Sequence, residues 1–324
     1  MSKVLPLLSC LAVSGALCGV LHAAEQSYPT KPIRVIIPTT PGGGSDQIMR
    51  TLGNKFTAAW GQQVVLDHRA GAGMTIGIDL AAKATPDGYT LILVNPSHAI
   101  NATLMSKLPY DPVRDLTPIT VVVTQSYGAI VPNTLPVKTV KDMIALAKSK
   151  PGELNFASSG NGSASHLAAE MFKNMAGVDM THIPYKGTGT AMPDLISGRT
   201  SLYINPLLAV INQVQAKQVR LIAVTSAKRV ASLPDIPTMS EAGVPGYEAT
   251  SWYMLLAPSK TPAAIVTKLN DEIVKDLKAE DMREMMARAG VEPLGNTPAE
   301  AMAFLKVEIA RWGKVIRMAN VKVD

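Results

Sequence analysis

Two turns rich in glycine and serine carry the residues best suited to holding a small charged group. Each turn follows a predicted buried strand, IRVIIP at 33–38 and ELNFAS at 153–158, and each precedes a predicted helix. Such a turn leaves backbone N–H groups unpaired at the helix start, where the helix dipole also attracts negative charge. The two turns, about 120 residues apart, therefore predict a site for a carboxylate or a phosphate. The candidates are Gly42, Gly43, Gly44 and Ser45 in the first turn and Ser158, Ser159, Gly160, Gly162 and Ser163 in the second.

Other interpretations of the two turns are less well supported. PGGGSD lacks the Lys-Ser/Thr ending of a P-loop, and GNGSAS lacks the third glycine of a dinucleotide fingerprint. No GxSxG nucleophile elbow is present. Ser163 and His166 leave a serine hydrolase open as an alternative, although a serine at a helix start is more often a cap. Either turn could also be an ordinary connection.

Further polar residues stand at strand ends, where ligands of α/β proteins usually bind. Asn95, Ser97 and His98 end one predicted strand, and Tyr185, Lys186 and Gly187 follow another. A packing role for His98 and a solvated Lys186 are the alternatives. Asp46 would repel a bound anion, so we expect it to cap the helix or to hold the first turn through backbone N–H groups.

The sequence offers little to a metal ion or a cofactor. The five histidines do not cluster, no HExxH motif occurs, and both cysteines, Cys10 and Cys18, lie near the N-terminus. We therefore expect no metal, no cofactor and no disulfide.

Composition excludes several other classes. The chain has 324 residues, of which 47% are hydrophobic and 17% charged, so a wholly disordered chain is excluded. The net charge of +6 comes from scattered Lys and Arg, and aromatic residues make up only 5%. Because nucleic-acid binding favours basic stripes and aromatic platforms, we expect no nucleic-acid partner.

The N-terminus has the pattern of an export signal. Lys3 precedes a stretch of apolar or small residues from Val4 to Val20, and Ala23 and Ala24 follow. This predicts a cleaved signal peptide at 1–24 and a mature protein in the periplasm, with an uncleaved membrane anchor as the alternative.

The rest of the chain alternates strands and helices. A βαβαβ run over 33–98 predicts an α/β fold with mixed, mostly parallel sheets flanked by helices. The pattern restarts at a helix capped by Thr139 and Asp142, and Gly177 is expected to end a later helix. The last third is mainly helical, with helix starts predicted at Thr261-Pro262 and Thr297-Pro298.

The chain also resembles the Bug family, the periplasmic solute receptors of tripartite tricarboxylate transporters. The resemblance covers the whole mature chain and is carried by PTTPGGGSDQIMR, HRAGAGMTIG, PDGYTLILVNPSHAINATL, ASSGNGSASHLAAEMF, HIPYKGTGTAMPDLISG and SLPDIPTMSEAGVPGY. It implies a two-lobed Venus-flytrap of the periplasmic binding protein type II fold. It also implies a carboxylated ligand between the lobes, bound largely by backbone amides and ordered water.

The resemblance extends the set of candidate residues. The family's loops match Thr39 to Asp46, Ser97 to Asn101, Ser158 to Ser163 and Tyr185 to Gly187, which adds Thr39 and Asn161. Asn205 stands where similar proteins more often carry aspartate or serine. His68 replaces the usual asparagine before Arg-x-Gly, and we expect little consequence.

These observations predict a monomeric receptor that delivers a small carboxylate to integral membrane transporter subunits. Lobe 1 is expected to comprise 25–124 and 251–324, and lobe 2 to comprise 125–250, with the hinge at the crossing strands. A ligand sensor for a signalling system is the alternative. The sequence does not choose among dicarboxylates, tricarboxylates, acidic amino acids and aromatic acids. It also leaves open whether Trp252 and Tyr253 line the cleft or belong to the core.

Overall fold

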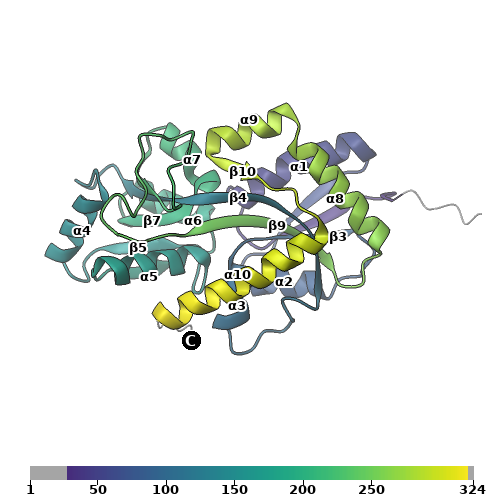
Figure 1. Ribbon diagram of the computed structural model, residues 1–324, viewed down its shortest axis with the longest axis horizontal. Helices are drawn as coiled ribbons and strands as arrows, with labels where there is room; N and C mark the ends of the chain where they lie inside the picture. The colour runs from purple at the N-terminus through teal and green to yellow at the C-terminus, as the bar shows by residue number, and fades with distance from the viewer. Residues whose placement is uncertain (1–27, 320–324) are drawn as a thin grey trace, which may run out of the picture.

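The protein is a two-lobed α/β molecule whose two lobes share a pair of long strands (Figure 1). The computed structural model describes residues 28–319, so the predicted signal peptide at 1–24 lies outside the described residues. Within 28–319, no helix combines the length and the hydrophobicity needed to cross a membrane. Over the same range, the His, Cys, Asp and Glu side chains form no group of three or more that could hold a metal ion.

The first lobe is built from βα units whose strands are parallel. Strand β1 lies between β2 and β3 and pairs with both in parallel register. Side chains alternate between the two faces of a strand, so Val35 and Ile37 pack toward α1 while Ile36 packs toward α2 on the opposite face. The elements are β1 (Ile33–Ile37), α1 (Gly44–Trp60), β2 (Val64–His68), the 3₁₀ helix η1 (Ala72–Met74), α2 (Thr75–Ala82), β3 (Thr90–Val94) and α3 (Ser97–Leu104).

The second lobe repeats the arrangement with β5 parallel to both β6 and β7. Thr139 and Asp142 form the predicted capping box at the start of its first helix. Gly177 ends α5 in the left-handed conformation, with φ of 62°, as predicted. The elements are α4 (Val140–Ser149), β5 (Asn155–Ser158), α5 (Ala164–Ala176), β6 (Thr181–Pro184), α6 (Thr188–Ile196), β7 (Leu202–Pro206), α7 (Leu207–Gln215) and β8 (Val219–Val224).

Two antiparallel strands connect the lobes. Strand β4 (Leu116–Pro132) pairs with β9 (Thr250–Pro258) and β10 (Val291–Pro293) over its first part, and with β7 and β8 from Tyr127 onward. All antiparallel pairs among the described strands involve β4 or β9. Among the named strands that the structure describes, parallel pairing is therefore found only in the βα units, and the sheet is more evenly mixed than the sequence predicted.

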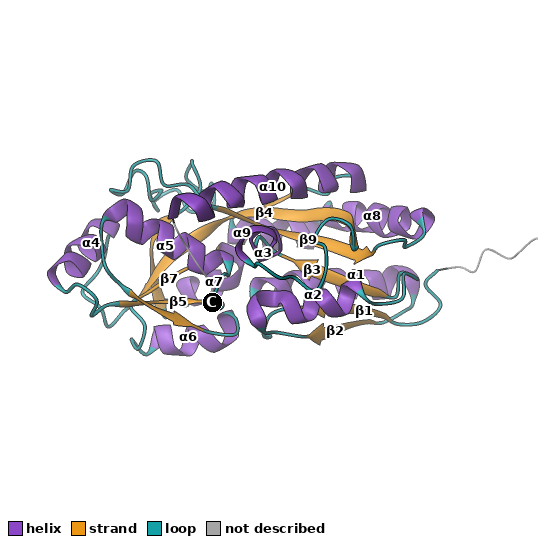
Figure 2. Ribbon diagram, turned by 90° about the horizontal axis from the view of Figure 1, so that it is seen from below, coloured by secondary structure: helices purple, strands orange, loops and turns teal. Residues whose placement is uncertain are grey.

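The C-terminal helices pack beside these connecting strands. They are α8 (Ala263–Leu277), α9 (Glu280–Ala289) and α10 (Pro298–Ala319), and α10 lies along β4 and α3 (Figure 2). Glu308 on α10 is buried and accepts hydrogen bonds from Trp252 Nε1 at 2.7 Å and Trp312 Nε1 at 3.1 Å. Thr297 and Glu300 form the predicted cap of α10, whereas Pro262 and not Thr261 occupies the cap position of α8.

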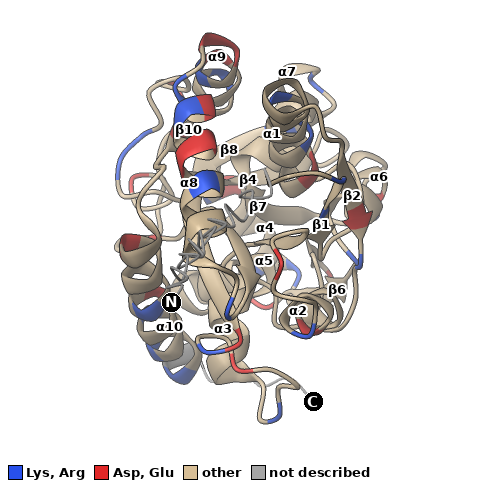
Figure 3. Ribbon diagram, turned by 90° about the vertical axis from the view of Figure 1, so that its right-hand side faces the viewer, with Lys and Arg blue, Asp and Glu red and all other residues tan. Residues whose placement is uncertain are grey.

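Charged side chains of both signs lie on the molecule's surface. Figure 3 shows Lys and Arg interspersed with Asp and Glu along α8 and α10. Neighbouring residues of these helices form ion pairs, such as Lys275 with Glu272 on α8 and Arg311 with the buried Glu308 on α10. This mixture matches the scattered charge of the sequence.

Candidate functional site

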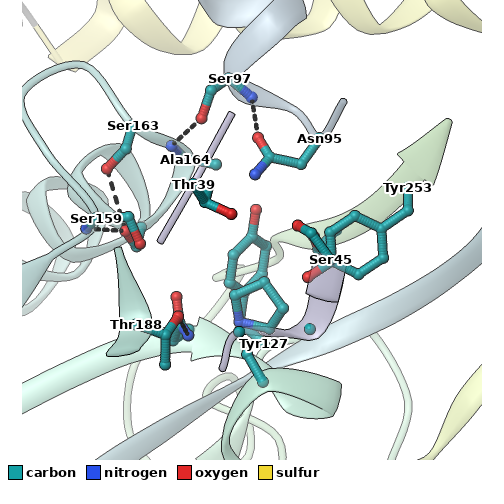
Figure 4. Close-up of a pocket in the computed structure, with 17 residues that line it drawn as sticks. Thr39, Ser45, Asn95, Ser97, Tyr127, Ser159, Ser163, Ala164, Thr188 and Tyr253 are labelled. Atoms are coloured by element: carbon teal, nitrogen blue, oxygen red, sulfur yellow. Dashed lines mark hydrogen bonds between the residues drawn. The ribbon is translucent and has the colours of Figure 1, made fainter. Parts of the chain in front are cut away.

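A small, partly open cavity lies where the two lobes meet the connecting strands (Figure 4). Its volume is about 30 Å³, which is room for about two water molecules. The lining residues come from both lobes and from β4 and β9. They are Thr39, Gly43, Gly44, Ser45, Asn95, Ser97, Tyr127, Ser159, Ser163, Ala164, Ser165, Thr188, Asn205, Pro206, Ala209, Ser251 and Tyr253.

Five helices direct their N-terminal ends at this cavity. Helices α1, α3, α5, α6 and α7 each contribute a lining residue from the cap or the first turn. The first four N–H groups of a helix have no partner within the helix, and each helix adds partial positive charge at this end. The cavity is therefore attractive to an anion.

The side chains lining the cavity are neutral. Ten of them carry a hydroxyl group, Asn95 and Asn205 carry amides, and none of these lining residues is Lys, Arg, His, Asp or Glu. Burial raises the pKa of Tyr127 and Tyr253, so both phenols keep their protons and remain donors. Attraction for an anion thus comes from backbone dipoles and hydroxyl donors.

Three of these hydroxyls have no hydrogen-bond partner among the described residues. They are Thr39 Oγ1, Tyr127 OH and Ser251 Oγ, and all are buried. Figure 4 shows the hydroxyls of Thr39 and Tyr127 directed into the cavity. Buried polar groups are normally hydrogen-bonded, so unpartnered hydroxyls at a cavity wall indicate contacts made to a ligand or to ordered water.

Replacing Tyr127 with phenylalanine is expected to weaken ligand binding by roughly 2- to 13-fold, the equivalent of one hydrogen bond of 0.5–1.5 kcal/mol. The thermal midpoint should change little, because this hydroxyl makes no bond within the described protein. Tyr247→Phe is the matched control, since its hydroxyl donates to the Ala168 carbonyl at 2.7 Å away from the cavity. Tyr247→Phe should lower the midpoint and leave affinity unchanged. Calorimetric titration and thermal unfolding would test both variants, and a Tyr127→Phe variant with unaltered affinity would contradict this role.

The first glycine turn is held by residues outside the cavity. Asp46 Oδ2 accepts from the Gly42 N–H at 3.3 Å and from Arg50 Nε at 3.0 Å, which confirms that Asp46 holds the turn. His68 Nε2 lies 3.0 Å from Asp46 Oδ1, and its Nδ1 lies 2.9 Å from the Thr39 carbonyl oxygen. His68, from which the sequence analysis expects little consequence, therefore contacts and supports the first turn directly.

The second glycine turn rests on two stacked histidines. The rings of His166 and His182 lie 3.9 Å apart between centroids. The Gly162 N–H donates to His166 Nδ1 at 3.1 Å, and His182 Nε2 lies 2.6 Å from Ser158 Oγ. Burial lowers the pKa of both rings, that of His182 to about 3, with the neighbouring His166 and Lys173 adding to the effect. Both imidazoles are therefore neutral near pH 7.

The two lobes contact each other around the cavity. Ser97 Oγ on α3 accepts from the Ala164 N–H on α5 at 3.2 Å. The loop before α6 also lies directly against the first glycine turn, because a Cβ at Gly187 would meet Thr40 and a Cβ at Gly189 would overlap the Pro41 carbonyl oxygen. Glycine at these positions permits the close approach of the lobes.

The structure brings together most of the predicted site residues. Those lining the cavity are Thr39, Gly43, Gly44, Ser45, Asn95, Ser97, Ser159, Ser163 and Asn205. A second, outer cavity of about 370 Å³ between the lobes is lined by Gly160, Asn161, Gly162, Tyr185 and Lys186, together with Ser159. Five predicted residues line neither: Gly42, Asp46, His98, Ser158 and Gly187.

The five residues outside both cavities have structural contacts of their own. His98 is fully buried, its Nε2 lies 3.0 Å from the Pro112 carbonyl oxygen, and burial lowers its pKa to about 4. Its position corrects the expectation that it faces the ligand. Helix α3 turns its side chain inward, so that only Ser97 reaches the cavity. The other four shape or contact the two turns through the bonds described above.

Sequence reasoning missed much of the cavity wall. Tyr127 and Ser251, which lie on the connecting strands β4 and β9, were not singled out, and neither was Thr188, the first residue of α6. The open question about the aromatic pair is also resolved, since Tyr253 lines the cavity while Trp252 turns to Glu308. Neighbouring strand residues face opposite sides, so these two could not both have lined it.

Two α/β lobes joined by crossing strands, with an anion-attracting cavity between them, define a solute-binding receptor. Comparison with known proteins agrees. The family profile described as "Tripartite tricarboxylate transporter family receptor" matches residues 48–321. The chain belongs to this family, and its relatives include Bug proteins.

Individual relatives match over nearly their full length. Protein BugT of Bordetella pertussis is 34% identical over 320 residues, covering 98% of each chain. The structure titled "R. palustris Rpa4515 with adipate" has a TM-score of 0.88 and 38% identity, covering 91% of this chain and 99% of that one. MatC from Rhodopseudomonas palustris with bound malate has a TM-score of 0.84 and 28% identity, covering 89% and 100%.

Proposed function

We propose that the protein is a periplasmic receptor that captures a small carboxylate in the cavity between its lobes and delivers it to membrane subunits of a tripartite transporter. The observation that carries this proposal is the convergence of five helix N-termini on a cavity lined by neutral donors. A carboxylate is the anion we favour, because the relatives Rpa4515 and MatC carry adipate and malate in their structures.

Capture requires the lobes to separate and close. The 30 Å³ between the lobes has room for only about two water molecules and not for a ligand of several heavy atoms, so entry widens the cavity. We place the lobes at 25–124 with 251–324 and at 125–250, with the hinge where β4 changes partners near Ser126 and Tyr127. A ligand bound to both glycine turns favours the closed state, since it contacts both lobes only there.

The contacts do not support the alternative of a serine hydrolase. Ser163 Oγ accepts from the backbone N–H of His166 at 3.3 Å and lies 3.1 Å from Ser165 Oγ, as expected of a helix cap. The His166 ring accepts from Gly162 and stacks on His182, so its Nδ1 is already engaged. We therefore propose that the protein acts by binding and is not an enzyme.

A thermal-shift panel on protein stripped of carried-over ligand tests this proposal. Adipate and malate are expected to raise the midpoint by several degrees at about 100 times Kd, where binding adds roughly 2.7 kcal/mol. Adipamide is the neutral control and inorganic phosphate the second anion, and neither should shift the midpoint. A flat response to all carboxylates, including aromatic and amino-acid members of the panel, would overturn the carboxylate assignment. Selective stabilisation by phosphate would replace it.

A further inference from the structure

The outer cavity between the lobes has the size of a small-molecule site. Its volume of about 370 Å³ lies within the range of ligand pockets, roughly 300–1,000 Å³, whereas the inner cavity has room for about two water molecules. In the first glycine turn, Pro38 lines the outer cavity and Thr39 the inner one. In the second turn, Gly162 lines the outer cavity and Ser163 the inner one, while Ser159 lines both. The two cavities therefore adjoin, and a ligand longer than one carboxylate can extend from the inner cavity into the outer one.

The wall of the outer cavity differs in chemistry from that of the inner cavity. Hydroxyl groups dominate the inner wall, whereas the outer wall is largely apolar. Met74 is buried, and Leu104 and Met105 come from the C-terminal end of α3. Each methylene group of a ligand that is buried against such a wall strengthens binding by about fourfold. The apolar side chains of the outer wall include those of Pro38, Met74, Leu104, Met105 and Pro184.

The polar side chains of the outer wall offer a ligand few free groups. Asn101 Nδ2 donates to a backbone carbonyl at 2.8 Å, and Tyr185 OH donates to Asp194 Oδ2 at 2.8 Å. Ser159 Oγ shares a hydrogen bond with Tyr203 OH at 2.8 Å. The other polar side chains of this wall are exposed to solvent and belong to Asn161 and Lys186. Buried hydroxyl groups of a ligand would therefore lack partners here, which is unfavourable.

The loop at 71–74 holds Met74 in a conformation that a bulky side chain disfavours. All four of its residues have a positive φ, including Ala72 at 45° and Met74 at 81°. Such a φ is a genuine outlier for a bulky residue, and strained backbone of this kind gathers at ligand-binding sites where neighbouring contacts maintain it. Here Asn101 Nδ2 holds the Gly73 carbonyl oxygen from α3. The fold thus maintains a strained loop that keeps Met74 at the cavity wall.

We propose that the outer cavity binds the body of the ligand and selects acids whose body is apolar. One carboxylate occupies the inner cavity, and a methylene chain or an aromatic ring lies against Met74, Leu104 and Met105. This inference rests on the proposed function and narrows its ligand class. Acids that carry several hydroxyl groups bind more weakly, because the outer wall gives those groups few partners.

Calorimetric titration with four acids at neutral pH tests this selection. Adipate and glucarate are the matched pair, since both are six-carbon dicarboxylates and glucarate adds only hydroxyl groups. Phenylacetate supplies an aromatic body, and malate is a short hydroxylated acid. Adipate or phenylacetate should bind roughly tenfold or more tightly than glucarate and malate, the scale of two buried methylene groups. Equal or tighter binding of a hydroxylated acid would overturn this inference and leave the receptor function standing. Binding of no carboxylate at all would overturn both.

A change of the outer wall tests the residues themselves. Met105→Gln keeps the length of the side chain and adds an amide, so it should weaken adipate binding by roughly fourfold, the scale of one methylene group, and leave glucarate binding unchanged or tighter. Met175→Gln is the matched control, because Met175 on α5 is 43% exposed and lines neither cavity. This variant should bind both acids as the native protein does. Met74→Gln is the second variant if a lowered thermal midpoint shows that Met105→Gln folds poorly. A native ratio of adipate to glucarate affinity in both wall variants would refute the role of the outer wall.

Discussion

Replacing Gly43 with aspartate is expected to weaken carboxylate binding at least 100-fold. Gly43 is the N-cap of α1, has an extended backbone with φ of −86° and lines the cavity. A Cβ there would lie 3.6 Å from Thr188 Oγ1, which is an ordinary contact, so the side chain fits. Its carboxylate would occupy the helix terminus that the ligand uses. Two charges about 6 Å apart at an effective dielectric constant near 20 repel by about 3 kcal/mol, or roughly 100-fold.

Gly43→Asn is the matched control for this charge. Aspartate and asparagine have nearly the same size and are both good N-caps, so both variants should fold as stably as the native protein or slightly more so. The asparagine variant should lose far less affinity, because it adds no charge. Isothermal titration of both variants with the same acid separates bulk from repulsion. Equal affinities for the two would show that the helix termini do not set the preference for an anion.

Replacing Gly189 with alanine is expected to prevent full closure and to weaken binding more than tenfold. Gly189 is the second residue of α6 and is exposed, yet a Cβ there would overlap the carbonyl oxygen of Pro41 in the opposite lobe. A backbone carbonyl group such as that of Pro41 cannot move aside as a flexible side chain would. The added methyl does not line the cavity, so any lost affinity reports closure itself.

Small-angle scattering would measure this effect directly. The native protein should contract when ligand is added, and Gly189→Ala should not. Its thermal midpoint without ligand should be unchanged or higher, because alanine favours a helix more than glycine does. Gly43→Ala is the control, since its Cβ also faces the other lobe but meets Thr188 at an ordinary distance and leaves closure possible. Normal contraction of Gly189→Ala would mean that the lobes close along a different path.

Local signals predicted much of the fold. The capping pairs at Thr139 and Thr297 and the terminal glycine at Gly177 act within one helical turn, so their residues suffice to place a helix end. The sequence pattern predicts a strand end at SHAIN, but this segment is the start of α3. The helix begins at Ser97, directly after Pro96, and the Ser97 N–H donates to Asn95 Oδ1. Because Pro96 stands close to the end of β3, the local sequence pattern did not reveal this helix start.

The candidate site was predictable only in part, for a physical reason. Glycine and serine at a strand-to-helix turn suggest an anion site from their local chemistry, and six of the lining residues come from the two turns at 39–46 and 158–163. Tyr127 and Ser251 lie in nearly continuous apolar strands, where nothing local separates a side chain facing a cavity from one in the core. His68 was undervalued because its partners, Thr39 and Asp46, are 29 and 22 residues away in sequence.

The convergence of helix ends has a consequence for how such receptors diversify. Because much of the attraction for an acid comes from main-chain N–H groups at five helix starts, deletion of one side chain should weaken binding without abolishing it. Descendants of one gene can therefore exchange serine, threonine, tyrosine or asparagine at the wall and acquire new acids without passing through a form that binds none. The fold retains the general preference for acids, while individual substitutions decide which acid is carried.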